Sequence, residues 1–398
     1  MQEPEALDRR SAQSPRLAPA STRPLRIYWF AWKDIRHPDA GGAEVVMHDW
    51  LCRLKRDGHD VLLVTARYPG AEAHGDIDGV PIVRVGRNRY THYWAAVWYY
   101  LRHLRHQADL LVEEVNTVPY LLSLVSKGER VLLFYPQLAR EIWFYQMPAV
   151  VGAVGYVCEA VYTWIQGRFR KPVVTISDDS KNDLLRFGFD GGRIGVVPLG
   201  IENTALTRYD AAAKEHRFTV LYHSSLRPMK RPMEALRAFA EFRQKGSDGQ
   251  LWMSGGGDAS SLRAFARERG VESDVVFFGK TTVEQKLDLM RRATVLVSTS
   301  VKEGWGLIVT EANSMGTPAV VYDVDGLRHA ARSAGNSVVP SQSSAMASKL
   351  ADMARLFTTQ RTSYDKVAEQ ALEGSRRFTL EGSYQSFAKL VVSEARHV

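Results

Sequence analysis

Short apolar runs alternate with amphipathic stretches along most of this 398-residue chain. Six runs in the first half have the length and composition of β-strands: residues 25–30, 61–66, 82–85, 110–115, 131–135 and 173–177. Five similar runs follow in the second half: residues 219–224, 251–255, 275–279, 294–300 and 317–323. Strands this apolar are buried on both faces, and strand–helix alternation produces parallel sheets. The sequence therefore predicts an α/β protein.

The polar stretch at residues 200–217 divides these runs into two series, and the chain is longer than one hydrophobic core usually organises. We expect two Rossmann-like domains, at residues 24–200 and 201–380, that face each other across a cleft. Residues 381–398 are expected to form a helix that crosses back onto the first domain. Residues 1–23 are polar and rich in Pro, Ala and Ser, so we expect a disordered tail there and no signal peptide.

Composition narrows the setting and the partners. Two cysteines make neither a disulfide framework nor a zinc cluster, so we expect a reducing, cytoplasmic compartment. The net charge of +8 favours anionic partners such as phosphates or acidic lipid. The chain shows no recognised DNA- or RNA-binding motif and its basic residues are spread along the sequence, so we expect no nucleic-acid partner.

The most informative stretch is VLVSTSVKEGWGLIVTEANSMGTPAVVYD, at residues 295–323. It predicts a strand that ends at Ser300, a loop that carries Glu303, and a helix from Leu307 that Gly316 terminates. Glycine lets the backbone approach a ligand closely, and the free amides at a helix N-terminus attract phosphate. We therefore expect the backbone around the helix start to bind phosphate: Gly304, Trp305, Gly306 and Leu307.

Two carboxylates frame this helix start. Glu311 lies about one turn inside the helix, where a carboxylate can accept both hydroxyls of a ribose. Glu303, before the helix, can reach a sugar or the positive charge that develops on it. On spacing alone, the alternative is a strand–loop–helix unit with two surface glutamates.

The whole string resembles the E-x7-E signature of retaining glycosyltransferases of family 4, in the form EGxGLxxxEAxxxGxPxV. The resemblance extends over most of residues 25–395 and implies the GT-B fold of two facing Rossmann-like domains. It implies a nucleoside-diphosphate-sugar donor in the C-terminal domain, in the first place a UDP- or GDP-sugar, and no metal. A hydroxyl acceptor, such as a glycan, a lipid-linked or a small molecule, would approach from the N-terminal domain.

Other segments resemble the donor-side motifs of this family. TVLYHSSLRPMKRPMEALRAFAEF (219–242) is similar to GRLxxxKxxxxLLxAF and puts Lys230 where the family's lysine binds the diphosphate. A cation at that position would stabilise the charge that grows on the leaving group. The alternative is a solvated lysine at a helix start. Residues 275–293 resemble the segment whose loop contacts the base, which assigns that role to the loop at about Gly279 to Thr281, with Gly279 and Lys280 as the expected contacts.

On the acceptor side, residues 37–65 contain the family's first glycine loop. Gly41 and Gly42 precede a helix whose N-terminus would point at the donor phosphates. Glu44, on its first turn, is either a surface acid that complements the helix dipole or an acceptor contact. Three polar residues at the end of the strand near residue 113 are candidates for binding acceptor hydroxyls, with structural capping as the rival explanation: Glu113, Glu114 and Asn116.

Two positions depart from the family's pattern. The arginine of GRL falls on Ser225, with Arg227 two positions on as a substitute contact to the diphosphate. Residues 131–148 resemble a stretch that begins HQLAREVWFYExP, and Pro136 occupies the place of a histidine that lies beside the donor sugar. The departures leave two main interpretations: an active transferase with a different arrangement, and a catalytically impaired binding or partner subunit. The retained Glu303 favours activity.

Residues 84–107 (RVGRNRYTHYWAAVWYYLRHLRHQ) combine six aromatic residues with arginines at both ends. On a helix they would form a basic, aromatic surface suited to lipid headgroups or to a lipid-linked acceptor. A core-packing helix with solvated arginines is the alternative. Peripheral contact with the inner face of a membrane is therefore a hypothesis that the structure has to address.

Overall fold

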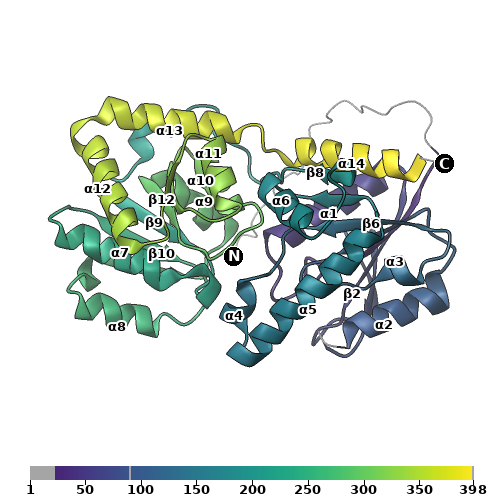
Figure 1. Ribbon diagram of the computed structural model, residues 1–398. Coiled ribbons are helices and arrows are strands. Elements are labelled where there is room, and N and C mark those ends of the chain that lie inside the picture. Colours follow the sequence, from purple (N-terminus) through teal and green to yellow (C-terminus); the bar gives the residue numbers. More distant parts are fainter. Residues whose placement is uncertain (1–22, 89–90, 397–398) are drawn as a thin grey trace, which may run out of the picture.

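The computed structural model describes residues 23–88 and 91–396, and they form two α/β lobes that lie next to each other (Figure 1). The first lobe contains an eight-stranded sheet in the order β3-β4-β2-β1-β5-β6-β7-β8. Its strands are β1 (Arg26–Phe30), β2 (Asp60–Ala66), β3 (His74–Ile77), β4 (Val80–Val85), β5 (Leu110–Glu114), β6 (Arg130–Tyr135), β7 (Val173–Thr175) and β8 (Ile194–Val196). Its helices are α1 (Gly42–Arg56), α2 (His92–Tyr99), α3 (Leu122–Val125), α4 (Ile142–Gln146), α5 (Ala149–Arg168) and α6 (Asp178–Arg186).

The second lobe contains a six-stranded sheet in the order β11-β10-β9-β12-β13-β14. Its strands are β9 (Thr219–His223), β10 (Gln250–Ser254), β11 (Val275–Gly279), β12 (Val295–Ser298), β13 (Ala319–Tyr322) and β14 (Ser337–Val339). The remaining helices are α7 (Pro232–Gln244), α8 (Ser260–Glu268), α9 (Val283–Arg292), α10 (Leu307–Ser314), α11 (Leu327–Ser333), α12 (Ser343–Thr359), α13 (Arg361–Ser375) and α14 (Leu380–Arg396). Within the described residues, every strand pair is parallel except β3 with β4.

Alternation along the strands sends side chains to two different cores in the first lobe. Ile27 and Trp29 of β1 join a cluster with residues of α1 and α14, whereas Tyr28 and Phe30 join a cluster on the opposite face. On the α1 side, the rings of Trp50 and Phe387 stack with centroids 4.3 Å apart. The helix at the end of the chain therefore packs against the first lobe, as the yellow ribbon in Figure 1 shows.

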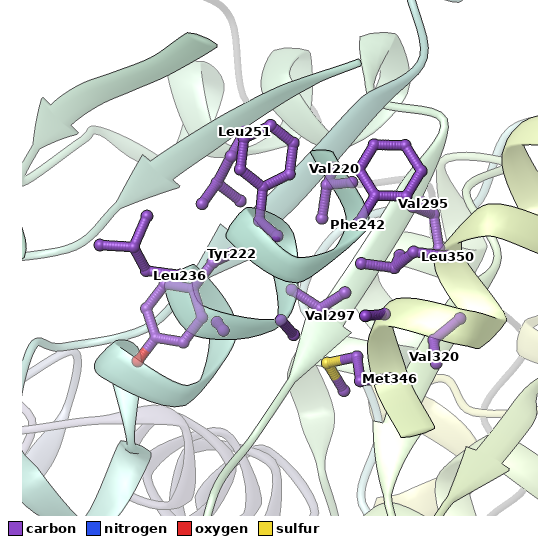
Figure 2. Packing of buried hydrophobic residues seen from close by; sticks show 14 of the residues in the cluster. Val220, Tyr222, Leu236, Phe242, Leu251, Val295, Val297, Val320, Met346 and Leu350 are labelled. Carbon is purple, nitrogen blue, oxygen red and sulfur yellow. The ribbon is translucent and has the colours of Figure 1, made fainter. Parts of the chain in front are cut away.

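The second lobe also has two clusters of buried side chains, and the larger one lies between its sheet and a layer of helices that includes α7 and α12 (Figure 2). The side chains of the strands and helices meet there: Val220, Tyr222, Leu251, Val295, Val297 and Val320 from strands, Leu236 and Phe242 from α7, and Met346 and Leu350 from α12. Close packing of this kind fixes the strand ends, and with them the loops that carry polar side chains.

All eleven strands expected from apolar runs are present, so the expected α/β class is confirmed. The prediction missed β3, β8 and β14, each of which forms the edge of a sheet. It also expected only parallel pairing, which is wrong for the antiparallel β3–β4 pair. The three missed strands have only three or four residues each, which is too short for a recognisable apolar run. The expected tail at residues 1–23 lies outside the described residues except for Arg23.

No helix in the part of the chain that the structure describes combines the length and the apolar character needed to cross a membrane.

Candidate active site

The loop between β12 and α10 has the conformation that its glycines predict. Gly306 immediately precedes α10 with a φ of 87°, a left-handed conformation that glycine adopts without a steric penalty. At the other end of α10, Gly316 donates to the carbonyl of Asn313 at 2.9 Å, and Thr317 donates to the carbonyl of Ala312 at 3.0 Å. This pair of bonds is the Schellman motif, so the predicted helix and its glycine stop are confirmed.

Glu303 lies in this loop and forms an ion pair with Lys230. Its carboxylate also accepts a hydrogen bond from Ser300 Oγ at 2.7 Å. Lys230 ends a short 3₁₀ helix, η4 (Pro228–Lys230), which leads into α7. The two side chains are 21% and 19% exposed, so the pair remains accessible to a ligand. Folding thus brings together a cation and a carboxylate from two separate strand-end loops.

Glu311 points toward α9, where Lys286 Nζ donates to its carboxylate at 2.9 Å. The Glu311 side chain is 17% exposed and that of Lys286 is 19% exposed. Sequence reasoning did not single out Lys286, because nothing in residues 275–293 distinguishes it from other helix-surface cations. A ligand hydroxyl that binds Glu311 would therefore share the carboxylate with a lysine.

The first residues of α1 and α10, which belong to different lobes, lie close together. A Cβ atom built on Gly42, the first residue of α1, would lie 2.7 Å from Leu307 Cδ1, at the first residue of α10. Helix N-termini carry partial positive charge and free amides, so their convergence suits an anion such as a diphosphate. At this edge, Arg227 also pairs with Asp39 of the first lobe at 3.4 Å.

Gly304 packs closely against the first lobe. A Cβ atom there would lie 2.8 Å from Ile176 Cδ1 and 3.1 Å from the carbonyl oxygen of Pro136. That carbonyl accepts a hydrogen bond from Ser180 Oγ at 3.0 Å. Pro136, which replaces the family's histidine, therefore packs its backbone directly against the loop of Glu303.

The other residues predicted to bind the donor lie at different depths. Trp305 is 2% exposed and packs between His329 and Phe378, and Gly304 and Gly306 on either side of it are also buried, so only Leu307 of this expected phosphate-binding stretch is partly exposed. Gly279 ends β11 with a φ of 66°, and Lys280 follows it as an exposed residue. Gly41 caps α1, and its amide donates to Glu44 Oε2 at 2.7 Å.

The structure changes the interpretation of Glu44. Its side chain is buried and forms an ion pair with Lys33 at 2.8 Å, while it also accepts the amide of Gly41. The expected surface exposure is therefore wrong, but the carboxylate does complement the start of α1 from its first turn, and a contact with an acceptor stays a prediction. Lys33, which the sequence did not single out, is its counter-ion.

Glu113 is wholly buried, so the expectation that it faces the cleft is wrong. Its two oxygens accept the backbone amides of Leu121 and Leu122, both at 2.9 Å, and Gln166 Nε2 donates to it at 3.1 Å. Glu113 therefore satisfies free backbone amides at the start of α3, which is the structural capping role given above as the rival explanation. Glu114 is also buried, with Trp29 Nε1 donating at 3.4 Å. Asn116 is half-buried after β5 and stays a candidate.

We expect Glu114→Gln to become more stable than the wild-type protein as the pH rises. Burial, followed by repulsion from Glu44, raises the pKa of Glu114 from 4.5 to about 8. The folded protein therefore keeps a proton that the unfolded chain loses, so wild-type stability falls between about pH 5 and about pH 8. The glutamine keeps the shape without titrating.

Chemical denaturation at both ends of this pH range checks the effect, with a relative gain of a few kcal/mol expected at the alkaline end. The exposed Glu369→Gln on α13 is the control and should show no comparable trend. A stability difference between Glu114→Gln and wild type that is the same at both pH values would contradict the buried, protonated Glu114.

α6 ties the first lobe to the Glu303 loop. Lys302 Nζ donates to Asp183 of α6 at 2.6 Å, and both side chains are largely buried. Asp179 of the same helix accepts the amide of Gly326 at 3.2 Å. Ser177 caps the start of this helix, because its hydroxyl accepts the amide of Ser180. The contact between the lobes, however, was missed, since pairing between residues this far apart leaves no local pattern.

Two family models match consecutive parts of the chain. The model described as Glycosyltransferase Family 4 matches residues 40–205, and the one described as Glycosyl transferases group 1 matches residues 205–372. Together they span both lobes and the loop that carries Glu303.

Curated relatives are similar over part of the chain. The D-inositol 3-phosphate glycosyltransferase of Acidothermus cellulolyticus is 33% identical over 163 residues, which are 37% of this chain and 36% of the relative. The protein of the same name from Rhodococcus erythropolis is 26% identical over 246 residues, which are 56% of this chain and 54% of the relative. The matches thus span between about a third and about half of these relatives' lengths.

Solved structures share the fold over nearly the whole chain. Sucrose-phosphate synthase from Thermosynechococcus elongatus has a TM-score of 0.73 at 18% identity and covers 93% of this chain and 98% of its own. Anabaena Alr3699/HepE, in complex with UDP and glucose, has a TM-score of 0.70 at 16% identity and covers 93% and 100%. The fold is GT-B, as expected. With both family models matched across its two lobes, the chain belongs to the family 4 glycosyltransferases, with a C-terminal domain of the group 1 type.

Proposed function

We propose that this protein transfers a sugar from a UDP- or GDP-sugar to a hydroxyl acceptor, with retention of configuration at the anomeric carbon. One observation carries the proposal: the N-termini of α1 and α10 converge beside the Glu303–Lys230 pair. Convergent amides and a lysine suit a diphosphate, and the carboxylate beside them suits the positive charge that develops on a sugar. The Anabaena protein that shares the fold is in complex with UDP and glucose, which supports a donor of this class.

In this proposal each part of the site has one task. Lys230 leaves Glu303 and binds the diphosphate, whose departing oxygens need a cation as the glycosidic bond breaks. Glu303 then faces the sugar, and Ser300 keeps its carboxylate oriented. The backbone at Gly41–Gly42 and at Gly304–Leu307 binds phosphate oxygens. Glu311 holds the ribose hydroxyls.

The residues proposed to contact the base, and a second cation for the diphosphate, are exposed. Gly279, the last residue of β11, and Lys280 after it would contact the base, and Arg227 would replace the family's arginine, whose position Ser225 occupies. Arg227 is exposed and its ion pair with the exposed Asp39 is weak, so it can turn toward a diphosphate. Asn116 remains the proposed acceptor contact at the end of β5.

Pro136, which occupies the place of the family's histidine, supports a second candidate function: a catalytically impaired partner subunit. Proline offers no side-chain donor or acceptor, and the backbone at Pro136 already bonds to Ser180. We favour the active enzyme because Glu303, Lys230 and Ser300 are assembled. Donor hydrolysis and transfer, measured for donors that bind, separate the two candidates: binding without turnover across acceptors supports the partner subunit.

We expect Glu311→Ala to weaken binding of the donor nucleotide by about tenfold to a hundredfold. The loss of two hydrogen bonds from a carboxylate to ribose hydroxyls has this magnitude, about 1.4 to 3 kcal/mol. Calorimetric titration with UDP and GDP measures it. Asp288→Ala, an exposed position on α9, is the matched control and should bind like wild type.

Unchanged affinity in Glu311→Ala would mean that Glu311 has no role at the ribose. A broader result tests the site as a whole. If no UDP-, GDP-, ADP- or dTDP-sugar raises the melting temperature of the wild-type protein, the donor site itself is refuted.

A further inference from the structure

The outward face of α5 is apolar along nearly its whole length. Six large apolar side chains on this 20-residue helix are between about half and three-quarters exposed: Val150, Val151, Val154, Val157, Val161 and Trp164. The only acid between residues 142 and 171 is Glu159, which is buried because it accepts the amides of Ala139 and Arg140. Exposed apolar patches of this extent mark interaction sites, and nothing in the described chain covers this one.

α2 extends the apolar surface beside α5. Trp94 and Trp98 are 81% and 62% exposed. Both helices pack on the same face of the first sheet, opposite to α14, and both flank the loop after β5. From α2, Tyr93 contacts Tyr120 of that loop with ring centroids 5.0 Å apart, and from α5, Tyr162 donates to the carbonyl of Thr117. We call the exposed apolar side chains of α2 and α5 the apolar face.

The rim of the apolar face is basic. Arg87 and Arg102, which flank α2, are exposed and Arg105 is half-buried, whereas Arg84 is buried and paired with Asp34. At the other edge, α5 ends at Arg168, whose guanidinium lies over the ring of Trp164 at 4.4 Å, and Arg170 and Lys171 follow. Tryptophan and arginine side by side are typical of surfaces that rest at the boundary between lipid tails and headgroups.

We propose that the apolar face docks this protein on an anionic lipid bilayer, with α5 lying in the plane of the interface. The valines of α5 enter the acyl boundary, and the tryptophans of α2 and α5 sit at headgroup level. The arginines at the rim bind the anionic headgroups. This placement sharpens the hypothesis drawn from residues 84–107, because the longest apolar surface is on α5.

Charge complementarity favours lipid over a second copy of this chain. A symmetric dimer through the apolar face would bring the same rim from both copies together, and arginine would meet arginine. Like charges held close at an interface oppose association, whereas an anionic bilayer neutralises them. The basic rim therefore points to a lipid surface as the occupant.

Docking in this orientation would place the cleft next to the lipid. α4, just before α5, reaches the second lobe, where Gln146 Nε2 contacts Met229 Sδ at 3.0 Å. Met229 precedes Lys230, the cation paired with Glu303. An acceptor anchored in the bilayer could thus enter the cleft along α4. This last step rests on the proposed transferase function, whereas docking itself does not.

Vesicle flotation without any donor tests the docking. We expect wild-type protein to float with vesicles of phosphatidylglycerol and phosphatidylcholine, and much less with phosphatidylcholine alone. Val154→Asp/Val157→Asp should lower the bound fraction at least tenfold at equal lipid. Val276→Asp, at an exposed valine of β11 in the second lobe, is the matched control and should float like wild type. Thermal unfolding shows whether each variant folds.

A second measurement reports how deeply the tryptophans enter the bilayer, and it remains usable if Val154→Asp/Val157→Asp does not fold. Brominated lipid should quench the tryptophan fluorescence of the wild-type protein, and Trp94→Phe/Trp98→Phe should lose a measurable part of that quenching. Wild-type protein that stays unbound, or a folded double aspartate variant that floats like wild type, overturns the proposal. So does a dimer in light scattering that Val154→Asp/Val157→Asp dissociates. Nucleotide titration is scored separately, so vesicle binding without donor binding would refute the proposed function and leave the docking intact.

Discussion

Glu303→Gln is expected to lower the rate constant of sugar transfer by about a thousandfold, which is the effect of removing one group that stabilises charge in a transition state. Glutamine keeps the shape of Glu303 and its bond to Ser300, but it carries no negative charge. Single-turnover consumption of the donor at saturating acceptor measures the change.

Donor affinity should move in the other direction, and this makes the test specific. Glu303 and Lys230 neutralise each other in the donor-free protein. Without the carboxylate, Lys230 is free for the diphosphate, so Glu303→Gln should bind nucleotide at least as tightly as wild type. A rate within a few-fold of wild type would show that Glu303 does not face the reacting sugar. A parallel loss of affinity would assign it to donor binding.

Lys302→Met is expected to cost about 3 kcal/mol of unfolding free energy, because it leaves Asp183 buried without its main counter-ion. The exposed Arg186 still pairs with Asp183 at 3.2 Å, which places the cost at the low end for a broken buried pair. Chemical denaturation measures it. The change should also loosen the contact between the lobes beside Glu303 and so reduce transfer.

Two further variants separate the ion pair from general packing. Lys302→Met/Asp183→Leu removes both charges and should recover most of the lost stability, since the cost comes from the uncompensated carboxylate. Arg186→Met touches the same aspartate from the solvent side and should change stability by less than about 1 kcal/mol. If Lys302→Met costs no more than Arg186→Met, the lobes are not held by this pair.

Much of the fold could be predicted because it depends on local pattern. Apolar runs located eleven strands, and glycine located the start and the end of α10. The three missed edge strands, β3, β8 and β14, have only three or four residues and so give no apolar run, whereas the five-residue edge strand β11 was found. The residues of the candidate site likewise fall into some that local pattern predicts and some that it does not. Glu303, Glu311 and Lys230 were found from motif spacing, whereas Lys286, Ser300 and Lys302 were not, because their partners come from other segments or from ordinary loop positions.

The sequence by itself determined the order of strands and helices, the glycine-rich loops and the residues that match the family's donor motifs. Only the tertiary structure decided which carboxylates are accessible to a ligand. Glu113 and Glu114 lie at the end of a parallel strand, where residues that face a cleft are expected, yet both are buried. It also decided that Glu44 is paired and that the apolar face centres on α5. The reason is physical. Local pattern records what a segment buries on average, but a side chain's charge partner and exposure depend on which distant segments pack against it.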